Sequence, residues 1–175
     1  KLINPETNKA IVPQSYEFNS NYTRVLIFTN TVKVWRYNTM GDYWLYDIIA
    51  NKLTKMGKKL LPQSLMFAKF SPDGKDVAYV SEHNIYSEDI SNGEITKLTK
   101  DGTRKLINGT FDWVYEEEFA FDRAFWWSPK GDYIAYLRFD ETAVPEFSMD
   151  VYGKELYPEQ VRFKYPKAGE VNSVV

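Results

Sequence analysis

The sequence predicts an all-β fold, a partial β-propeller of about three to four four-stranded blades. Three observations predict it. Aromatic residues, which pack well on pleated surfaces, make up 17% of the chain. An eleven-residue pattern occurs three times without gaps, starting at Phe18, Phe70 and Trp127, which are 52 and 57 residues apart. That period is close to the length of a propeller blade and longer than the period of helical repeats.

Each copy of the repeat begins with an aromatic residue, continues through a tight turn and ends in an apolar strand. The copies cover residues 18–28, 70–80 and 127–137. In the second and third copies Pro72 or Pro129 presets one backbone dihedral of the turn. Gly74 or Gly131 then supplies a conformation that other residues resist. We therefore expect the same turn and strand in every copy.

A hairpin follows the repeat, over residues 45–54 in the first unit and 85–99 in the second, where Asn92-Gly93 forms the turn. A small β-sandwich with regular turns is the alternative fold, and the gapless match of three copies argues against it. A closed propeller needs at least four blades. We therefore expect residues 1–175 to be a fragment of a larger propeller domain.

The composition excludes several functions. The chain has no Cys and one His, so it cannot form a disulfide scaffold, a thiolate metal site or a multi-His zinc site. Its net charge of -2 argues against nucleic acid as a partner. There is no glycine-rich phosphate loop and no Gly-x-Ser-x-Gly elbow. We expect no catalytic residue, metal or cofactor within this chain.

Two inserts interrupt the repeat, and inserts on a repeat scaffold are where function is expected. About 12 extra residues lie around Arg36, and a second insert before Trp127 contains three consecutive carboxylates, Glu116, Glu117 and Glu118. If Asp112 caps a short helix, neighbouring carboxylates could converge on one cation. The alternative is a solvated acidic turn with Arg36 as a surface ion-pair partner.

Five short motifs stand out in the sequence: Trp35-Arg36, Asp112-Trp113-Val114-Tyr115-Glu116-Glu117-Glu118, Trp126-Trp127-Ser128-Pro129, residues 140–145 and residues 165–172. Together they resemble the propeller domain of the dipeptidyl peptidase IV family of serine exopeptidases. The matches are dense over residues 100–175 and sparser before. Residues 119–123 depart from the family, because they lack a small hydroxyl residue expected shortly after the glutamates.

The resemblance implies an eight-bladed propeller that covers an α/β-hydrolase domain. It implies that Glu117 and Glu118 bind the free N-terminal ammonium of a peptide, while Arg36 helps to hold them and contacts a substrate carbonyl. Glu116 would not be a direct ligand. The activity would be release of Xaa-Pro or Xaa-Ala dipeptides, with the catalytic Ser, Asp and His beyond Val175. The chain alone would then be inactive.

The resemblance also implies an extended arm, over residues 142–164, that helps to form a homodimer. We expect exposed Tyr152, Leu156, Tyr157 and Phe163 on it. The alternative is a long hairpin packed on its own blade. The absence of Cys is more similar to the bacterial members of the family, which implies a bacterial source and a periplasmic or exported location.

Two other functions stay open on the sequence. The chain could belong to a noncatalytic propeller whose acidic loop binds a basic protein. It could instead belong to a related oligopeptidase or acylaminoacyl peptidase. The glutamate pair argues against this second class, since an endopeptidase has no terminal ammonium to bind.

Overall fold

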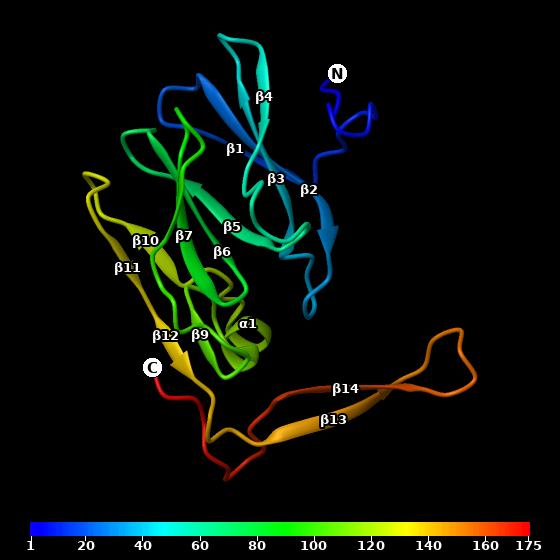
Figure 1. Cartoon of the computed structure of the whole chain (residues 1–175). Coiled ribbons are helices and arrows are strands. Elements are labelled where there is room, and N and C mark those ends of the chain that lie inside the picture. The colour runs from blue at the N-terminus through cyan, green and yellow to red at the C-terminus, as the bar shows by residue number, and fades with distance from the viewer.

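Strands dominate the structure. The computed structural model describes residues 1–175 and contains fourteen strands and one short helix (Figure 1). The first eight strands are β1 (Ser15–Phe18), β2 (Arg24–Val32), β3 (Met40–Asp47), β4 (Lys52–Lys55), β5 (Leu65–Phe70), β6 (Asp76–Ser81), β7 (Asn84–Asp89) and β8 (Ile95–Lys97). They are followed by β9 (Leu106–Asn108), α1 (Trp113–Phe119), β10 (Phe125–Trp127), β11 (Ile134–Tyr136), β12 (Arg138–Asp140), β13 (Glu146–Val151) and β14 (Glu159–Lys164). The prediction of an all-β fold with a short helix over the glutamates is therefore confirmed.

The first eight strands form two antiparallel meanders. In the first, β1 pairs with β2, β2 with β3 and β3 with β4. The second repeats this order from β5 to β8. The two join into one eight-stranded sheet where Met40 and Gly41 of β3 pair with Met66 and Leu65 of β5. Each meander contains one copy of the repeat and the hairpin expected after it.

The turns of the three copies lie side by side, on the left of Figure 1. Gly74 and Gly131 have φ of 72° and 81°, as their positions in the repeat predict. Tyr22 occupies the equivalent place in the first copy and takes a left-handed φ of 58° without being glycine. The guanidinium of Arg24 donates to the carbonyl of Gly74 at 3.0 Å, which ties the first turn to the second.

The core lies between successive units of the repeat. The largest cluster joins apolar side chains of β2 and β3 to those of β5, β6 and β7, and fully buried Tyr79 belongs to it. A second cluster joins β6 and β7 to Phe125 of β10, which is also fully buried. Burying one such side chain stabilises a fold by roughly 1.5–3 kcal/mol. The apolar faces therefore hold each unit against the next.

The third unit differs from the first two. It contains two separate two-stranded sheets, β10 with β11 and β9 with β12, and α1 lies between β9 and β10 in the chain. Residues 141–173 then leave the unit and return to it, since Asp140 forms a bridge with Val174. The four-stranded pattern of the first two units is thus absent from the third within residues 100–175.

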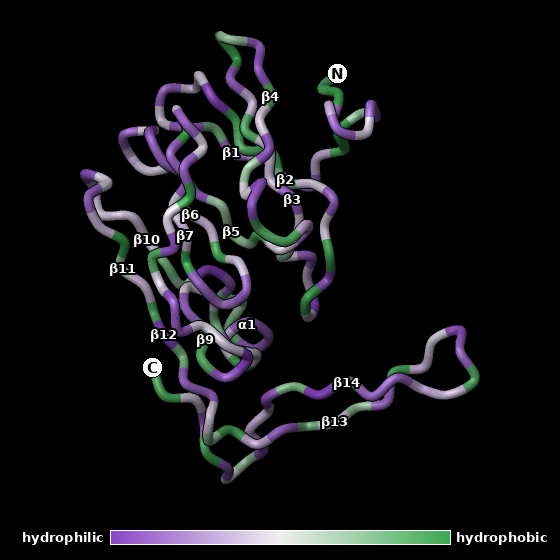
Figure 2. Tube along the Cα trace, in the orientation of Figure 1, coloured by the Kyte–Doolittle hydropathy of each residue, from purple (hydrophilic) through white to green (hydrophobic).

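The excursion forms the predicted arm. Strands β13 and β14 pair as an antiparallel hairpin that extends away from the other strands (Figure 1). Apolar stretches alternate with polar ones along it, including one at its far end (Figure 2). Tyr152, Leu156 and Tyr157 are exposed, as expected, but Phe163 is half-buried. That part of the prediction is wrong because the base of the arm packs on other segments. The single helix, α1, has seven residues, which is too few to span a membrane.

Candidate functional site

The short helix α1 places the three glutamates. Its N-cap is Asp112, whose side chain accepts a hydrogen bond from the backbone N–H of Tyr115 at 3.0 Å. The other carboxylate oxygen of Asp112 accepts from the hydroxyl of Ser173. The helix ends after Phe119, where Ala120 takes a left-handed φ of 56°. The predicted cap therefore forms, and consecutive glutamates point in different directions around the helix.

Arg36 lies at the tip of the loop that joins β2 to β3, and it holds Glu117. Its backbone N–H donates to Glu117 Oε1 at 2.9 Å, and its Nε lies 2.8 Å from Glu117 Oε2. The Glu117 side chain is 9% exposed, whereas that of Arg36 is 61% exposed. The structure thus brings together two of the predicted residues from segments 81 positions apart.

Glu118 is exposed, and its carboxylate makes no hydrogen bond or ion pair with the protein. The pair therefore consists of one carboxylate that Arg36 holds in place and one that is available to a ligand. A primary ammonium has three donors and one positive charge, so a carboxylate is a matching partner for it.

Glu116 lies on the inner side of the helix. It is 4% exposed, and its Oε1 has no hydrogen-bond partner. Burial, reinforced by the negative charges of Glu117 and Asp122, raises the pKa of Glu116 to about 7. Glu116 and Glu141 both line a cavity of about 360 Å³. Burial and the charge of Asp112 raise the pKa of Glu141 to about 7 as well. Glu116 therefore faces the interior, whereas Glu118 is exposed to solvent.

The structure adds three aromatic residues to the site that the repeat pattern did not single out. Trp35 precedes Arg36, Trp113 begins α1, and both rings contact the ring of Phe163 from the arm. The sequence contained a signal, because Trp35 precedes Arg36 and Trp113 follows the predicted helix cap Asp112. Nothing in the sequence indicated that Phe163 would join them.

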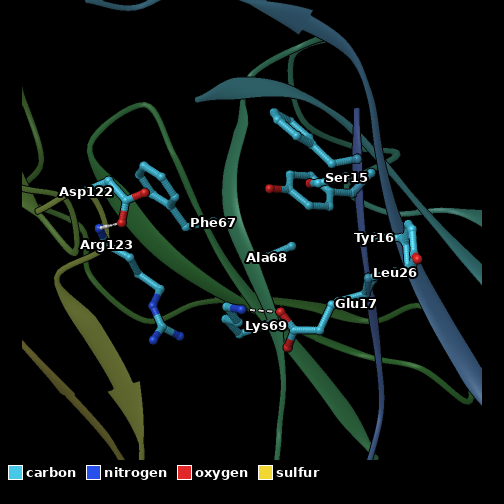
Figure 3. Close-up of a pocket in the computed structure, with 11 residues that line it drawn as sticks. Ser15, Tyr16, Glu17, Leu26, Phe67, Ala68, Lys69, Asp122 and Arg123 are labelled. Atoms are coloured by element: carbon cyan, nitrogen blue, oxygen red, sulfur yellow. Dashed lines mark hydrogen bonds and ion pairs between the residues drawn. The ribbon is translucent and has the colours of Figure 1, made fainter. Parts of the chain in front are cut away.

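A second cavity, of about 310 Å³, contains none of the predicted site residues. It lies among β1, β5 and the segment after α1 (Figure 3). Asp122 lies beside Phe67 on one side of it, the Arg123 side chain points away from Phe67, and Lys69 pairs with Glu17 on another side. Because its charged groups of both signs lie close together, this cavity has no net charge that would select a cationic ligand.

Fold and site together define a class of protein: an all-β repeat domain whose inserted helix and inserted loop present an arginine-held carboxylate beside a free one. Comparison with known proteins gives the family. The model for the dipeptidyl peptidase IV (DPP IV) N-terminal region matches residues 19–175. This chain belongs to that family, as the motifs predicted.

Individual relatives support this family assignment. The chain is 42% identical over 164 residues to dipeptidyl aminopeptidase B of Saccharomyces cerevisiae, an alignment that covers 91% of the chain and 19% of the relative. It is 37% identical over 187 residues to dipeptidyl-aminopeptidase B of Aspergillus niger, covering 100% of the chain and 21% of the relative. The crystal structure of Porphyromonas gingivalis dipeptidyl peptidase 4 superposes with a TM-score of 0.85 at 36% identity, covering 95% of the chain and 23% of that protein. The chain thus spans about a fifth of the length of the curated relatives.

Proposed function

We propose that this chain is a substrate-recognition segment of a serine dipeptidyl peptidase that releases Xaa-Pro or Xaa-Ala dipeptides. Glu117 and Glu118 anchor the N-terminal ammonium of the peptide, and Arg36 fixes Glu117 and meets a substrate carbonyl. The observation that carries the proposal is the double contact of Arg36 with Glu117 beside an unpaired Glu118. The names of the relatives support the reaction class.

The proposed site fixes the distance from the N-terminus of the peptide to the bond that is cleaved. Two carboxylates that accept charge-assisted hydrogen bonds from an ammonium hold the end of the peptide at a set distance from the nucleophile. An acetylated N-terminus has no positive charge and would leave the carboxylates unmatched in the bound state. Dipeptide release and exclusion of blocked peptides therefore follow from one anchor.

The proposal extends to the whole protein. The meanders β1–β4 and β5–β8 are two blades, and residues 100–175 contribute to the next part of an eight-bladed propeller. An α/β-hydrolase domain outside residues 1–175 supplies the Ser, Asp and His, so residues 1–175 are inactive alone. The short coverage of the relatives supports this division.

Two more features belong to the proposal. The hairpin β13–β14 joins two copies as a homodimer, which its projection and its exposed apolar tip support. A bacterial source and a periplasmic or exported location stay predictions from the resemblance. The relatives compared come from fungi and from P. gingivalis.

The test uses the full-length protein, a chromogenic Xaa-Pro substrate and its N-acetylated twin. We expect cleavage of the free-amine substrate alone. Glu118→Gln should lower kcat/KM by about 10- to 100-fold, because it removes the negative charge that strengthens the hydrogen bond to the ammonium. Glu155→Gln, which changes an exposed carboxylate of the arm, is the matched control and should leave kcat/KM unchanged.

Each other result contradicts the proposal in its own way. Equal cleavage of both substrates would indicate an oligopeptidase or acylaminoacyl peptidase. Cleavage of neither would indicate a noncatalytic propeller that binds proteins. Normal kcat/KM in Glu118→Gln, with the acetylated twin still rejected, would assign the ammonium to other residues.

A further inference from the structure

The base of the arm takes part in an aromatic cluster beside the candidate site. The cluster comprises Trp35, Trp113, Phe147, Phe163 and Tyr165. These residues come from three parts of the chain: the loop between β2 and β3, the first position of α1, and the arm. All five are partly buried. They are therefore packed side chains rather than isolated surface rings.

Phe163 is the member that touches all three parts. Its ring centroid lies 5.3 Å from that of Trp35, 6.1 Å from that of Trp113 and 5.8 Å from that of Phe147. These separations are in the range of favourable aromatic pairs. One side chain of β14 thus contacts the Arg36 loop, α1 and the opposite strand of its own hairpin.

The loop has few other attachments. Within residues 33–39 the remaining hydrogen bonds are local, from Val34 to Tyr37 and from Asn38 to Thr31. The only polar contact with another segment is that of Arg36 with Glu117. The position of the loop relative to α1 therefore depends on this ion pair and on the packing of Trp35 against Phe163.

We propose that Phe163 is a positioning residue for the ammonium anchor. By packing against Trp35 and Trp113 at once, its ring sets the spacing between Arg36 and the helix that carries Glu117 and Glu118. The arm is then a part of substrate specificity as well as a dimer contact. This inference rests on the proposed function, because it assigns Phe163 a role in the same site.

The test compares Phe163→Ala with Phe147→Ala in the full-length protein. The two residues face each other in the register of the hairpin, and Phe147 has no ring contact with Trp35 or Trp113. For the free-amine Xaa-Pro substrate we expect Phe163→Ala to raise KM by about 10-fold, the effect of losing the contacts with Trp35 and Trp113. Phe147→Ala should raise KM much less.

Three readouts separate positioning from general damage. The kcat of Phe163→Ala should stay within about twofold of wild type, because the reacting groups are untouched. Phe163→Tyr, which keeps the ring, should restore KM. Labelling by a small serine-directed reagent without an amine should proceed at the wild-type rate. Trp35→Leu removes the contact with Phe163 from the loop side, so it replaces Phe163→Ala in the test if that variant does not fold. The KM of the double variant should differ little from that of either single variant.

Oligomeric state is measured on every variant by light scattering. If Phe163→Ala is monomeric, loss of the dimer could itself raise KM. Its KM must then exceed that of a second variant made monomeric by changes at the arm tip alone. Equal KM for Phe163→Ala and Phe147→Ala, or a loss of kcat with unchanged KM, would overturn the inference. Failure of the proposed function is recognised separately, because Glu118→Gln would then have wild-type kcat/KM.

Discussion

Arg36 contacts Glu117 with two chemically different groups, its backbone N–H and its guanidinium. The backbone contact depends only on where the loop lies, whereas the guanidinium adds charge and a planar set of donors. Since the Arg36 side chain is 61% exposed, the ion pair by itself contributes little stability. In the proposed site, the role of this ion pair is to orient Glu117.

Glu116 gives a prediction for pH dependence. Because its pKa is raised from 4.5 to about 7, the folded state binds this proton more tightly than the unfolded state. Stability is therefore lost as the pH rises from 4.5 towards 7, by up to about 3 kcal/mol above that range. Glu116→Gln removes the ionisation, and we expect it to raise the thermal midpoint near pH 8 and to have little effect near pH 4.

The control for this measurement is the exposed Glu155→Gln, for which the midpoints should match wild type at both pH values. A Glu116→Gln variant that changes the midpoint equally at both pH values would show that ionisation of Glu116 is not the cause. A difference from wild type that grows with pH in Glu116→Gln alone would therefore be assigned to this carboxyl group and its interaction with Glu117 and Asp122.

At the scale of single elements, short polar contacts hold the connections between strands. Gly102 donates its backbone N–H to the side chain of Asn84 at 3.0 Å, next to the two-residue turn between β6 and β7. A Cβ at Gly102 would collide with the backbone carbonyl of His83. The backbone at position 102 can approach His83 this closely because glycine has no side chain.

We therefore predict that Gly102→Ala lowers the stability of the full-length protein by about 1–3 kcal/mol, the usual cost of overpacking. Gly153→Ala is the control, since nothing lies within 4 Å of the added Cβ. Thermal unfolding of the two variants measures the difference. Identical midpoints would mean that the connection relaxes around the methyl group.

At the scale of the whole molecule, the exposed arm tip is the surface on which the proposed homodimer depends. Tyr152, Leu156 and Tyr157 are 81%, 89% and 78% exposed, and a cluster of such side chains is typical of an interface. We predict that replacing all three by Ser makes the full-length protein monomeric without changing the cluster around Phe163. Light scattering measures the mass in solution.

The matched control changes three polar positions of the same hairpin to Ser and should leave the dimer intact. These positions are Asp150, Lys154 and Glu155. Dissociation in both variants would mean that the arm has lost its shape rather than its contact surface. A persistent dimer after the apolar change would place the interface elsewhere.

What the sequence could predict is local in the chain. The left-handed glycines of the repeat turns, the Asn92-Gly93 hairpin and the Asp112 cap all formed as expected. Each depends on the steric and hydrogen-bonding properties of a few neighbouring residues. The stacking of the three copies also follows, because each unit has apolar faces that only its neighbours can cover.

The sequence alone determined the all-β repeat, the helix over the glutamates and the arm. The resemblance placed Arg36 near the glutamates. Only the tertiary structure decided that its contact is with Glu117, across 81 positions, that Glu116 is buried, and that Phe163 packs beside the site instead of facing solvent. The physical reason is that such contacts depend on how whole units and inserts pack in three dimensions. Burial and charge pairing are properties of that packing, and they are not set by the residues adjacent in the chain.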